Sequence, residues 1–283
     1  MATGADDQGD QGNLGDMDEV DEVDDPTDFA GPPEDELARA RELIAGARRI
    51  VVLTGAGVST DSGIPDFRGP NGVWTRDPEA ERLSTIDVYL SDPEVRRRAW
   101  RRRRDHPAWV AAPNPRPLAI RELDRQGRLH LLVTQNIDGL HLAAGHDAER
   151  VVQVHGSLPE AHCTRCDWSG PTTEVLDRVR AGEADPPCPE CGGVIKPRIV
   201  FFGEELVADD VERAFRAAEE ADLLLAVGTT LAVYPVAHMV PIAAGADIPV
   251  VIVNGSETEM DFLASAVVRG SISDVLPDLV AGI

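Results

Sequence analysis

Lysine is almost absent from this chain of 283 residues: of its 27 basic residues, only Lys196 is a lysine. Aromatic residues make up 4% of the chain, and only four residues are cysteines. No apolar run approaches the roughly 18–20 residues that a membrane helix needs, which argues against a membrane protein. The N-terminus lacks the charged and then apolar pattern of a secretory signal, so we expect a cytoplasmic protein.

Positive charge is scarce as well, and the formal net charge is −23. Residues 1–36 contain 14 of the 50 acidic residues and no lysine or arginine. Their richness in Asp, Gly and Gln predicts a disordered acidic tail over residues 1–33, with a specific contact to a basic partner as the alternative. Because the remainder is acidic too, we do not expect direct nucleic-acid binding.

The four cysteines form two pairs, Cys163-x2-Cys166 and Cys188-x2-Cys191, separated by 21 residues. In a protein without a secretory signal, paired CxxC motifs favour a metal site over disulfides. Two such pairs are typical of a zinc ribbon, in which four thiolates close the tetrahedron and leave no position for a catalytic water. We therefore predict one structural Zn²⁺.

Apolar runs of strand length recur along the chain, at residues 50–54, 129–134, 151–154, 223–227 and 249–253. They are nearly continuous Val, Leu and Ile, which is typical of strands buried on both faces of a parallel sheet. Helical patterns lie at residues 34–48 and 208–221. The sequence therefore predicts an α/β fold with a Rossmann-like, doubly wound parallel sheet.

The first predicted strand runs directly into Gly55-Ala56-Gly57 and a polar segment. A strand that ends in Gly-x-Gly is typical of a dinucleotide phosphate site. The glycines let the backbone approach a pyrophosphate, and amide groups at a helix start favour its negative charge. The match is incomplete, because Thr60 stands where the third glycine is expected.

The run from Gly55 to Gly69, which continues through Ile64-Pro65-Asp66-Phe67-Arg68, resembles the signature of the sirtuins, NAD-dependent protein-lysine deacylases. The resemblance covers roughly residues 37–281, and its further blocks follow in the family's order: residues 134–141, 154–156, the four cysteines, 200–204, 228–231 and 253–254. It implies NAD as cofactor and acyl-lysine proteins as substrates. The oligomeric state stays unknown.

The resemblance also implies a division of the chain into two domains. A Rossmann-like NAD-binding domain takes residues 34–68, 114–156 and 198–283. A small domain, made of a helical insertion and the zinc ribbon, takes residues 69–113 and 157–197. The ligands are then expected in the crevice between them, above the carboxyl ends of the strands.

In sirtuin chemistry the acyl-lysine carbonyl oxygen attacks the ribose C1′ of NAD, nicotinamide leaves, and a base activates a ribose hydroxyl. The acyl group departs as O-acyl-ADP-ribose. His155 ends the apolar strand at residues 151–154, and histidine has a pKa near neutrality. The resemblance assigns His155 as that general base, whereas the residues alone leave a structural histidine as the alternative.

Other cofactor contacts follow from the resemblance. It places Asn136 and Asp138 in the nicotinamide pocket, although an Asx turn after a strand is the alternative for both. It gives Phe67 the task of shielding C1′ from water and Arg68 that of steadying the ribose and phosphates. The remaining expected contacts are Gly55, Ala56, Gly57, Ser59, Asp66, Gln135, Ile137, Gly228, Thr229, Thr230, Asn254, Gly255 and Ile272.

The acyl-lysine peptide is expected to bind by strand addition, which uses backbone groups of both partners. The expected contacts are Val200, Phe201, Phe202, Gly203, Glu204 and Val233. Sirtuins that remove acidic acyl groups carry a Tyr-x-x-Arg pair in the region of the arginine-rich residues 96–104. Here that pair reads Trp100 and Arg103, so we expect acetyl groups to be preferred over succinyl groups. The alternative is that these arginines form a solvent-exposed helix face without a specific function.

Two other functions remain open on the sequence. One is a mono-ADP-ribosyltransferase that uses the same cofactor pocket. The other is a non-catalytic NAD-sensing binding module recruited through its acidic tail. The joint presence of His155, Asn136 and Asp138 argues against the second.

Deletion of residues 1–33 tests the prediction for the tail. Because the segment precedes the first helical pattern and has a disordered composition, kcat/KM on short acyl-lysine peptides should stay unchanged. Solubility or partner binding should change instead. A large loss of peptide turnover in steady-state assays would show that the tail folds against the rest of the protein.

Overall fold

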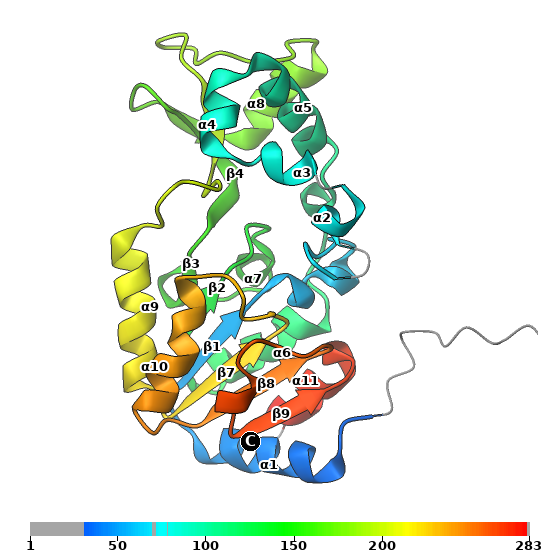
Figure 1. Cartoon of the computed structure of the whole chain (residues 1–283), viewed down its shortest axis with the longest axis vertical. Coiled ribbons are helices and arrows are strands. Elements are labelled where there is room, and N and C mark those ends of the chain that lie inside the picture. Colours follow the sequence, from blue (N-terminus) through cyan, green and yellow to red (C-terminus); the bar gives the residue numbers. More distant parts are fainter. Residues whose placement is uncertain (1–30, 70–71, 78, 282–283) are drawn as a thin grey trace, which may run out of the picture.

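A six-stranded parallel sheet forms the base of the protein (Figure 1). The computed structural model describes residues 31–69, 72–77 and 79–281, so nearly all of the predicted tail lies outside the described residues. The strand order is β3-β2-β1-β7-β8-β9. Successive strands are added toward one edge of the sheet from β1 to β3 and toward the other edge from β7 to β9, so the strand order reverses between β1 and β7. The strands are β1 Ile50–Thr54, β2 Leu129–Thr134, β3 Val151–Gln153, β7 Leu223–Val227, β8 Val250–Asn254 and β9 Ala266–Arg269.

Helices cover both faces of this sheet, which explains why its strands consist mostly of Val, Leu and Ile. Ile50 and Val52 of β1 pack on the face covered by α1 Glu34–Gly46, α6 Pro115–Arg125 and α11 Ile272–Val280. Val51 and Leu53 pack on the other face, against α9 Ala208–Glu220 and α10 Met239–Gly245. The predicted doubly wound α/β fold is confirmed.

A smaller unit lies above the sheet (Figure 1). Its antiparallel sheet has the order β5-β4-β6. Trp100, Leu176 and Ile195 are fully buried in its core. Its strands and helices are β4 Gly156–Cys163, β5 Ser169–Pro171, β6 Ile195–Ile199, α2 Val73–Arg76, α3 Glu79–Arg82, α4 Ile86–Ser91, α5 Pro93–Arg104 and α8 Thr172–Arg180. The domain boundaries given above stay a prediction.

Local sequence signals set where the helices near the site begin. Asp92 accepts the Glu94 N–H at 2.9 Å to cap α5, and Asn114 accepts the Arg116 N–H at 2.9 Å to cap α6. A proline then occupies the first helical position, where no amide donor is needed. No helix in the described part of the chain combines the length and hydropathy that a membrane crossing requires.

The sequence pattern placed five of the six strands of the large sheet to within one residue and missed the sixth, and it did not predict the small-sheet strands β4, β5 and β6 individually. β3 ends at Gln153 instead of residue 154, and β8 is shifted by one residue to Val250–Asn254. The missed strand is β9, which has only four residues and lies at the sheet edge. Its alternate residues are only partly buried, so it lacks the continuous apolar pattern that revealed the others.

The loops after β1 and β7 pack backbone against backbone where the strand order reverses. The Gly57 N–H donates to the Gly228 carbonyl at 2.9 Å. A Cβ atom on Gly57 would lie 2.8 Å from Gly228 Cα, and one on Gly228 would lie 2.7 Å from the Val58 nitrogen. Gly228 also has a φ of 61°, which favours glycine. The two loops can approach this closely only without side chains.

Gly228→Ala should therefore cost more stability than the same change at an unobstructed left-handed glycine. Gly127, with a φ of 70° and no atom within 4 Å of its Cβ position, is the matched control. The backbone term alone lowers the free energy of unfolding by about 1–2 kcal/mol, and overpacking at Gly228 adds about 1–3 kcal/mol. Urea unfolding measures both variants, and equal losses would contradict the packing described here.

Candidate active site

A cavity of about 1030 Å³ opens at the carboxyl ends of the central strands. The loops after β1, β2, β7 and β8 reach it, together with His155 after β3 and the segment that follows β6. The parallel arrangement brings these segments together, although they are far apart in the sequence. Of the residues predicted from sequence, those lining the cavity are Gly55, Ala56, Gly57, Asp66, Phe67, Arg68, Gln135, Asn136, Ile137, His155, Val200, Phe201, Phe202, Gly203, Glu204, Gly228, Thr229, Thr230, Val233 and Asn254.

The other predicted residues do not line the cavity. They are Ser59, Asp138, Gly255, Ile272, Trp100 and Arg103. Ile272 is buried in the core at the start of α11, where it packs against the sheet. Trp100 is buried in the core of the small unit, and the Arg103 guanidinium lies 5.2 Å from the centre of the Phe201 ring. The structure therefore does not bring the Trp100 indole or the Arg103 guanidinium to the cavity wall.

His155 is held in one orientation by a single hydrogen bond. Its Nδ1 lies 2.8 Å from the Gln135 carbonyl oxygen. A carbonyl oxygen only accepts, so Nδ1 carries the proton and Nε2 of the neutral ring is left as a base. Burial lowers the pKa of His155, and the hydrogen bond to Gln135 partly opposes that change. The ring is therefore neutral and able to accept a proton near pH 7.

A buried polar network holds Asn136 at the floor of the cavity. Asn136 Nδ2 donates to the Gly55 carbonyl at 2.9 Å and to Ser59 Oγ at 3.1 Å. Ser59 Oγ in turn donates to Asp138 Oδ2 at 2.7 Å. Both amide protons of Asn136 are thereby used inside the protein. Ser59 and Asp138 thus contact the site through Asn136 and do not line it themselves.

His141 lies behind the same floor and is unsuited to act as a base. Its Nε2 lies 3.0 Å from Thr54 Oγ1, which donates to Thr134 Oγ1 at 2.9 Å. Because the Thr54 proton is used in that bond, His141 Nε2 must be the donor. Burial lowers the pKa of His141 to about 3, so the ring stays neutral. Its hydrogen bond joins the short helix α7 Leu140–Ala143 to the end of β1.

The fit of a dinucleotide to this cavity can be judged from the polar groups of its wall. Gln135 Oε1 accepts from Thr229 Oγ1 at 2.9 Å, while its buried Nε2 has no hydrogen-bond partner in the described part of the chain. A ribose hydroxyl would satisfy that donor. Arg68 is the one arginine or lysine among the described lining residues and would face the phosphates. These groups fit NAD.

The glycine loop differs in one respect from what its sequence suggested. The Gly55 N–H donates to the Val227 carbonyl at 3.2 Å, and the Gly57 N–H is bonded to Gly228. These two amides are used to join the loops after β1 and β7 and are not directed at a phosphate. Because the glycines have no side chains, the two loops can make this backbone contact, and the joined loops form part of the cavity wall.

Trp74 is a lining residue that the sequence did not reveal as such. Its ring centre lies 4.8 Å from that of Phe67 and 5.3 Å from that of Phe202, and the Arg68 guanidinium lies 4.6 Å from it. The loop predicted to cover the cofactor is thereby joined to the segment predicted to bind the peptide. Other missed lining residues carry no motif that marks them: Leu206, Val211 and Phe215.

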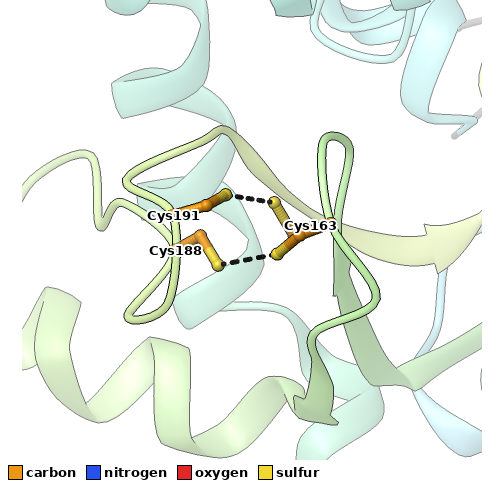
Figure 2. A group of neighbouring side chains, drawn as sticks. Cys163, Cys188 and Cys191 are labelled. Atoms are coloured by element: carbon orange, nitrogen blue, oxygen red, sulfur yellow. Dashed lines mark hydrogen bonds between the residues drawn. The ribbon is translucent and has the colours of Figure 1, made fainter.

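The four cysteines meet at the outer end of the small sheet (Figure 2). The Cys163 and Cys191 sulfurs are 3.5 Å apart, those of Cys166 and Cys188 are 3.6 Å apart, and all four lie within 4.8 Å of one another. Zn–S bonds of about 2.3 Å in a tetrahedron place sulfurs about 3.8 Å apart. The donor set therefore fits a structural Zn²⁺, and none of its ligands lines the cavity.

Comparison with known proteins agrees with this fold. The family model described as "Sir2 family" matches residues 55–235. The NAD-dependent protein deacetylase 2 of Streptomyces coelicolor is 45% identical over 240 residues, which cover 85% of this chain and 100% of the relative. The NAD-dependent protein deacetylase 1 of Pyrobaculum aerophilum is 45% identical over 248 residues, 87% of this chain and 94% of the relative.

Solved structures give the same result. One described as the structural basis for the mechanism and regulation of Sir2 enzymes has a TM-score of 0.79 at 37% identity, covering 88% of this chain and 97% of the other. A complex described as Sir2, p53 peptide and NAD⁺ has a TM-score of 0.76 at 33% identity, covering 84% and 94%. Fold and site define a nucleotide-binding α/β protein with a metal-bearing small sheet. The chain belongs to the Sir2 family.

Replacing Cys188 with serine tests the metal site. Loss of one of four thiolates should release zinc and destabilise the small unit, because the free energy of binding a structural zinc contributes directly to the free energy of folding. Turnover should fall even though no cysteine lines the cavity. Metal analysis, urea unfolding and activity assays measure the three effects. One zinc per chain with normal activity would show that the site is wrongly assigned.

Proposed function

We propose that this chain is a protein-lysine deacylase that uses NAD to remove acetyl groups, with His155 as its general base. The observation that carries the proposal is the Nε2 of a neutral His155, which has no hydrogen-bond partner among the described residues, beside a cavity lined by the glycine loop and by residues 200–204. Family membership supports the NAD dependence. The relative solved with a p53 peptide and NAD⁺ supports a protein substrate.

NAD supplies the ribose–nicotinamide bond that breaks and the ADP-ribose that receives the acyl group. The chain's own residues orient and protect this reaction. His155 Nε2 accepts the proton of a ribose hydroxyl, and the Gln135 carbonyl stabilises the resulting imidazolium through Nδ1. Asn136 holds the nicotinamide end, since its network fixes the side chain before the ligand binds.

Water is excluded mainly by aromatic side chains. The Trp74 ring contacts those of Phe67 and Phe202 along one side of the cavity, and this apolar wall protects the reacting carbon from hydrolysis. The peptide lies between residues 200–204 and Val233 and is held through their backbone groups, as in strand addition.

The charges of the cavity favour a neutral acyl group. Its acidic lining residues include Glu204, Glu205 and Glu212, whereas Arg68 is the one arginine or lysine among the described lining residues. The Arg103 guanidinium stacks among Tyr89, Trp100 and Phe201 instead. A succinyl carboxylate would thus meet like charge, and the one lining arginine, Arg68, is already assigned to the phosphates of NAD. This supports the expected preference for acetyl-lysine.

His155→Ala is the test of the proposed chemistry. Loss of a general base reduces turnover by about 10²–10⁴-fold, whereas ADP-ribose binding should persist because His155 is one of many lining residues. The assay follows nicotinamide release with matched acetyl and succinyl peptides, and isothermal calorimetry follows ADP-ribose. A deacetylation rate of the variant within a few-fold of the wild-type rate would contradict the assignment of His155 as general base.

The pH dependence of wild-type turnover is a second test of the role of His155. Because burial lowers the pKa of His155, kcat/KM for the peptide should be flat at neutral pH. It should fall on acidification, as Nε2 becomes protonated, with a midpoint below the ordinary histidine value of about 6.5. An acid limb centred above that value would contradict the geometry described here.

A further inference from the structure

The chain's single lysine is buried beneath the segment that is expected to bind the peptide. Lys196 lies on β6 and is 3% exposed. Its Nζ donates to Glu204 Oε2 at 2.7 Å, to Glu204 Oε1 at 3.0 Å and to the Ile199 carbonyl at 2.9 Å. All three ammonium protons therefore have acceptors, and the Phe201 ring lies 4.7 Å from Nζ.

Glu204 connects this ammonium to the cavity wall. The carboxylate oxygen that accepts from Lys196 at 2.7 Å also accepts the Phe201 N–H at 2.8 Å. The Glu204 N–H donates back to the Phe201 carbonyl at 3.0 Å. Residues 201–204 are thus closed into a turn by one backbone and one side-chain bond, and all four line the cavity.

The other side of Lys196 leads to the metal site. β6 pairs with β4, and in this register Lys196 lies opposite His162 while Ile195 lies opposite Cys163. The strand that holds a zinc ligand is thereby joined, through one ion pair, to the turn at residues 201–204. This gives a physical route by which a metal site outside the cavity can influence the cavity wall.

A buried ion pair is weak evidence for stability, because removing two charges from water costs about as much as their attraction returns. Burial lowers the pKa of Lys196, and the hydrogen bond and charge of Glu204 oppose that change. What the pair does provide is a fixed geometry. It allows one arrangement of the Glu204 carboxylate and hence one arrangement of the Phe201 amide.

We propose that Lys196 and Glu204 form a positioning pair that holds the peptide-binding turn, residues 201–204, on the metal-bearing small sheet. Lys196 does not line the cavity and acts through Glu204, which does. This inference rests on the proposed deacylase function and adds to it a residue that sets peptide affinity. The cofactor-facing residues on β1, β2 and β7 make none of these contacts.

Lys196→Met is the first test, carried out on the zinc-loaded full chain. KM for an acetyl-lysine peptide should rise about tenfold or more while kcat at saturating peptide changes by less than about threefold, the pattern of lost ground-state positioning. ADP-ribose affinity and zinc content should stay at wild-type values. Lys196→Arg, which restores a cation, should recover part of the peptide affinity.

Arg198→Met is the matched control. Arg198 lies two residues along the same strand and pairs with Glu160, but both side chains are about half exposed, so little should change. An equal rise in KM for both variants would overturn the proposal. So would loss of zinc or of ADP-ribose binding in a Lys196→Met protein that circular dichroism shows to be folded, because the effect of the pair would then not be confined to the peptide-binding turn.

Glu204→Gln keeps the variant set informative if Lys196→Met does not fold. It retains an oxygen for the Phe201 N–H and removes the charge that holds the ammonium. Peptide affinity should fall, and Lys196 should react faster with an acetylating reagent, which mass spectrometry reads directly because the chain has no other lysine. Unchanged affinity and labelling would overturn the pairing.

Failure of the proposed function is distinguishable from failure of this inference. If wild-type protein releases no nicotinamide with any acyl peptide, the deacylase proposal fails. Peptide affinity measured by fluorescence anisotropy still compares wild type, Lys196→Met and Arg198→Met. Equal affinities in the three proteins overturn the positioning pair, and a selective loss in Lys196→Met supports it.

Discussion

The backbone contact between the loops after β1 and β7 is the constraint on which the site depends. It lies where the strand order reverses, and three glycines with no space for a side chain make it possible. Once these loops are joined, the carboxyl ends of β1, β2 and β7 surround one cavity. Gln135, Asn136 and Thr229 reach its wall from two sides of that contact. The chemistry is therefore positioned by packing before any ligand binds.

The reactive group is governed by burial and one hydrogen bond. His155 lies at the end of β3, where the Gln135 carbonyl from the neighbouring β2 loop fixes its tautomer. His141 shows the contrast: it is more deeply buried, its Nε2 must donate, and its pKa falls to about 3. Two histidines from family-like blocks thus differ in their capacity to accept a proton, because their hydrogen-bond partners and burial differ.

Much of the fold was predictable because its core strands are buried on both faces and read as continuous apolar runs. β9 escaped because an edge strand of four residues leaves no such pattern. The cysteine pairs and His155 were found from motif and position. Trp74 was not found, because its role arises from contact with Phe202, which is more than a hundred residues away in the sequence. The role of Lys196 was not found either, because it depends on an ion pair with Glu204 that no sequence motif indicates.

Placement also separated residues that the sequence had grouped together. Trp100 and Arg103 were predicted as a pair near the acyl group, yet both are buried in the small unit and neither lines the cavity. Ser59 and Asp138 act behind Asn136. A helix pattern tells which residues share a face, but only the packing of α5 against the small sheet decides where that face points.

The central claim is that the chain transfers an acyl group from lysine to ADP-ribose. The most direct measurement uses a peptide whose lysine carries a ¹³C-labelled acetyl group, incubated with NAD and the full-length chain, with all products weighed by mass spectrometry. The account predicts free lysine, nicotinamide and labelled acetyl-ADP-ribose in equal amounts. A peptide that keeps its labelled acetyl group and gains the mass of ADP-ribose would contradict it.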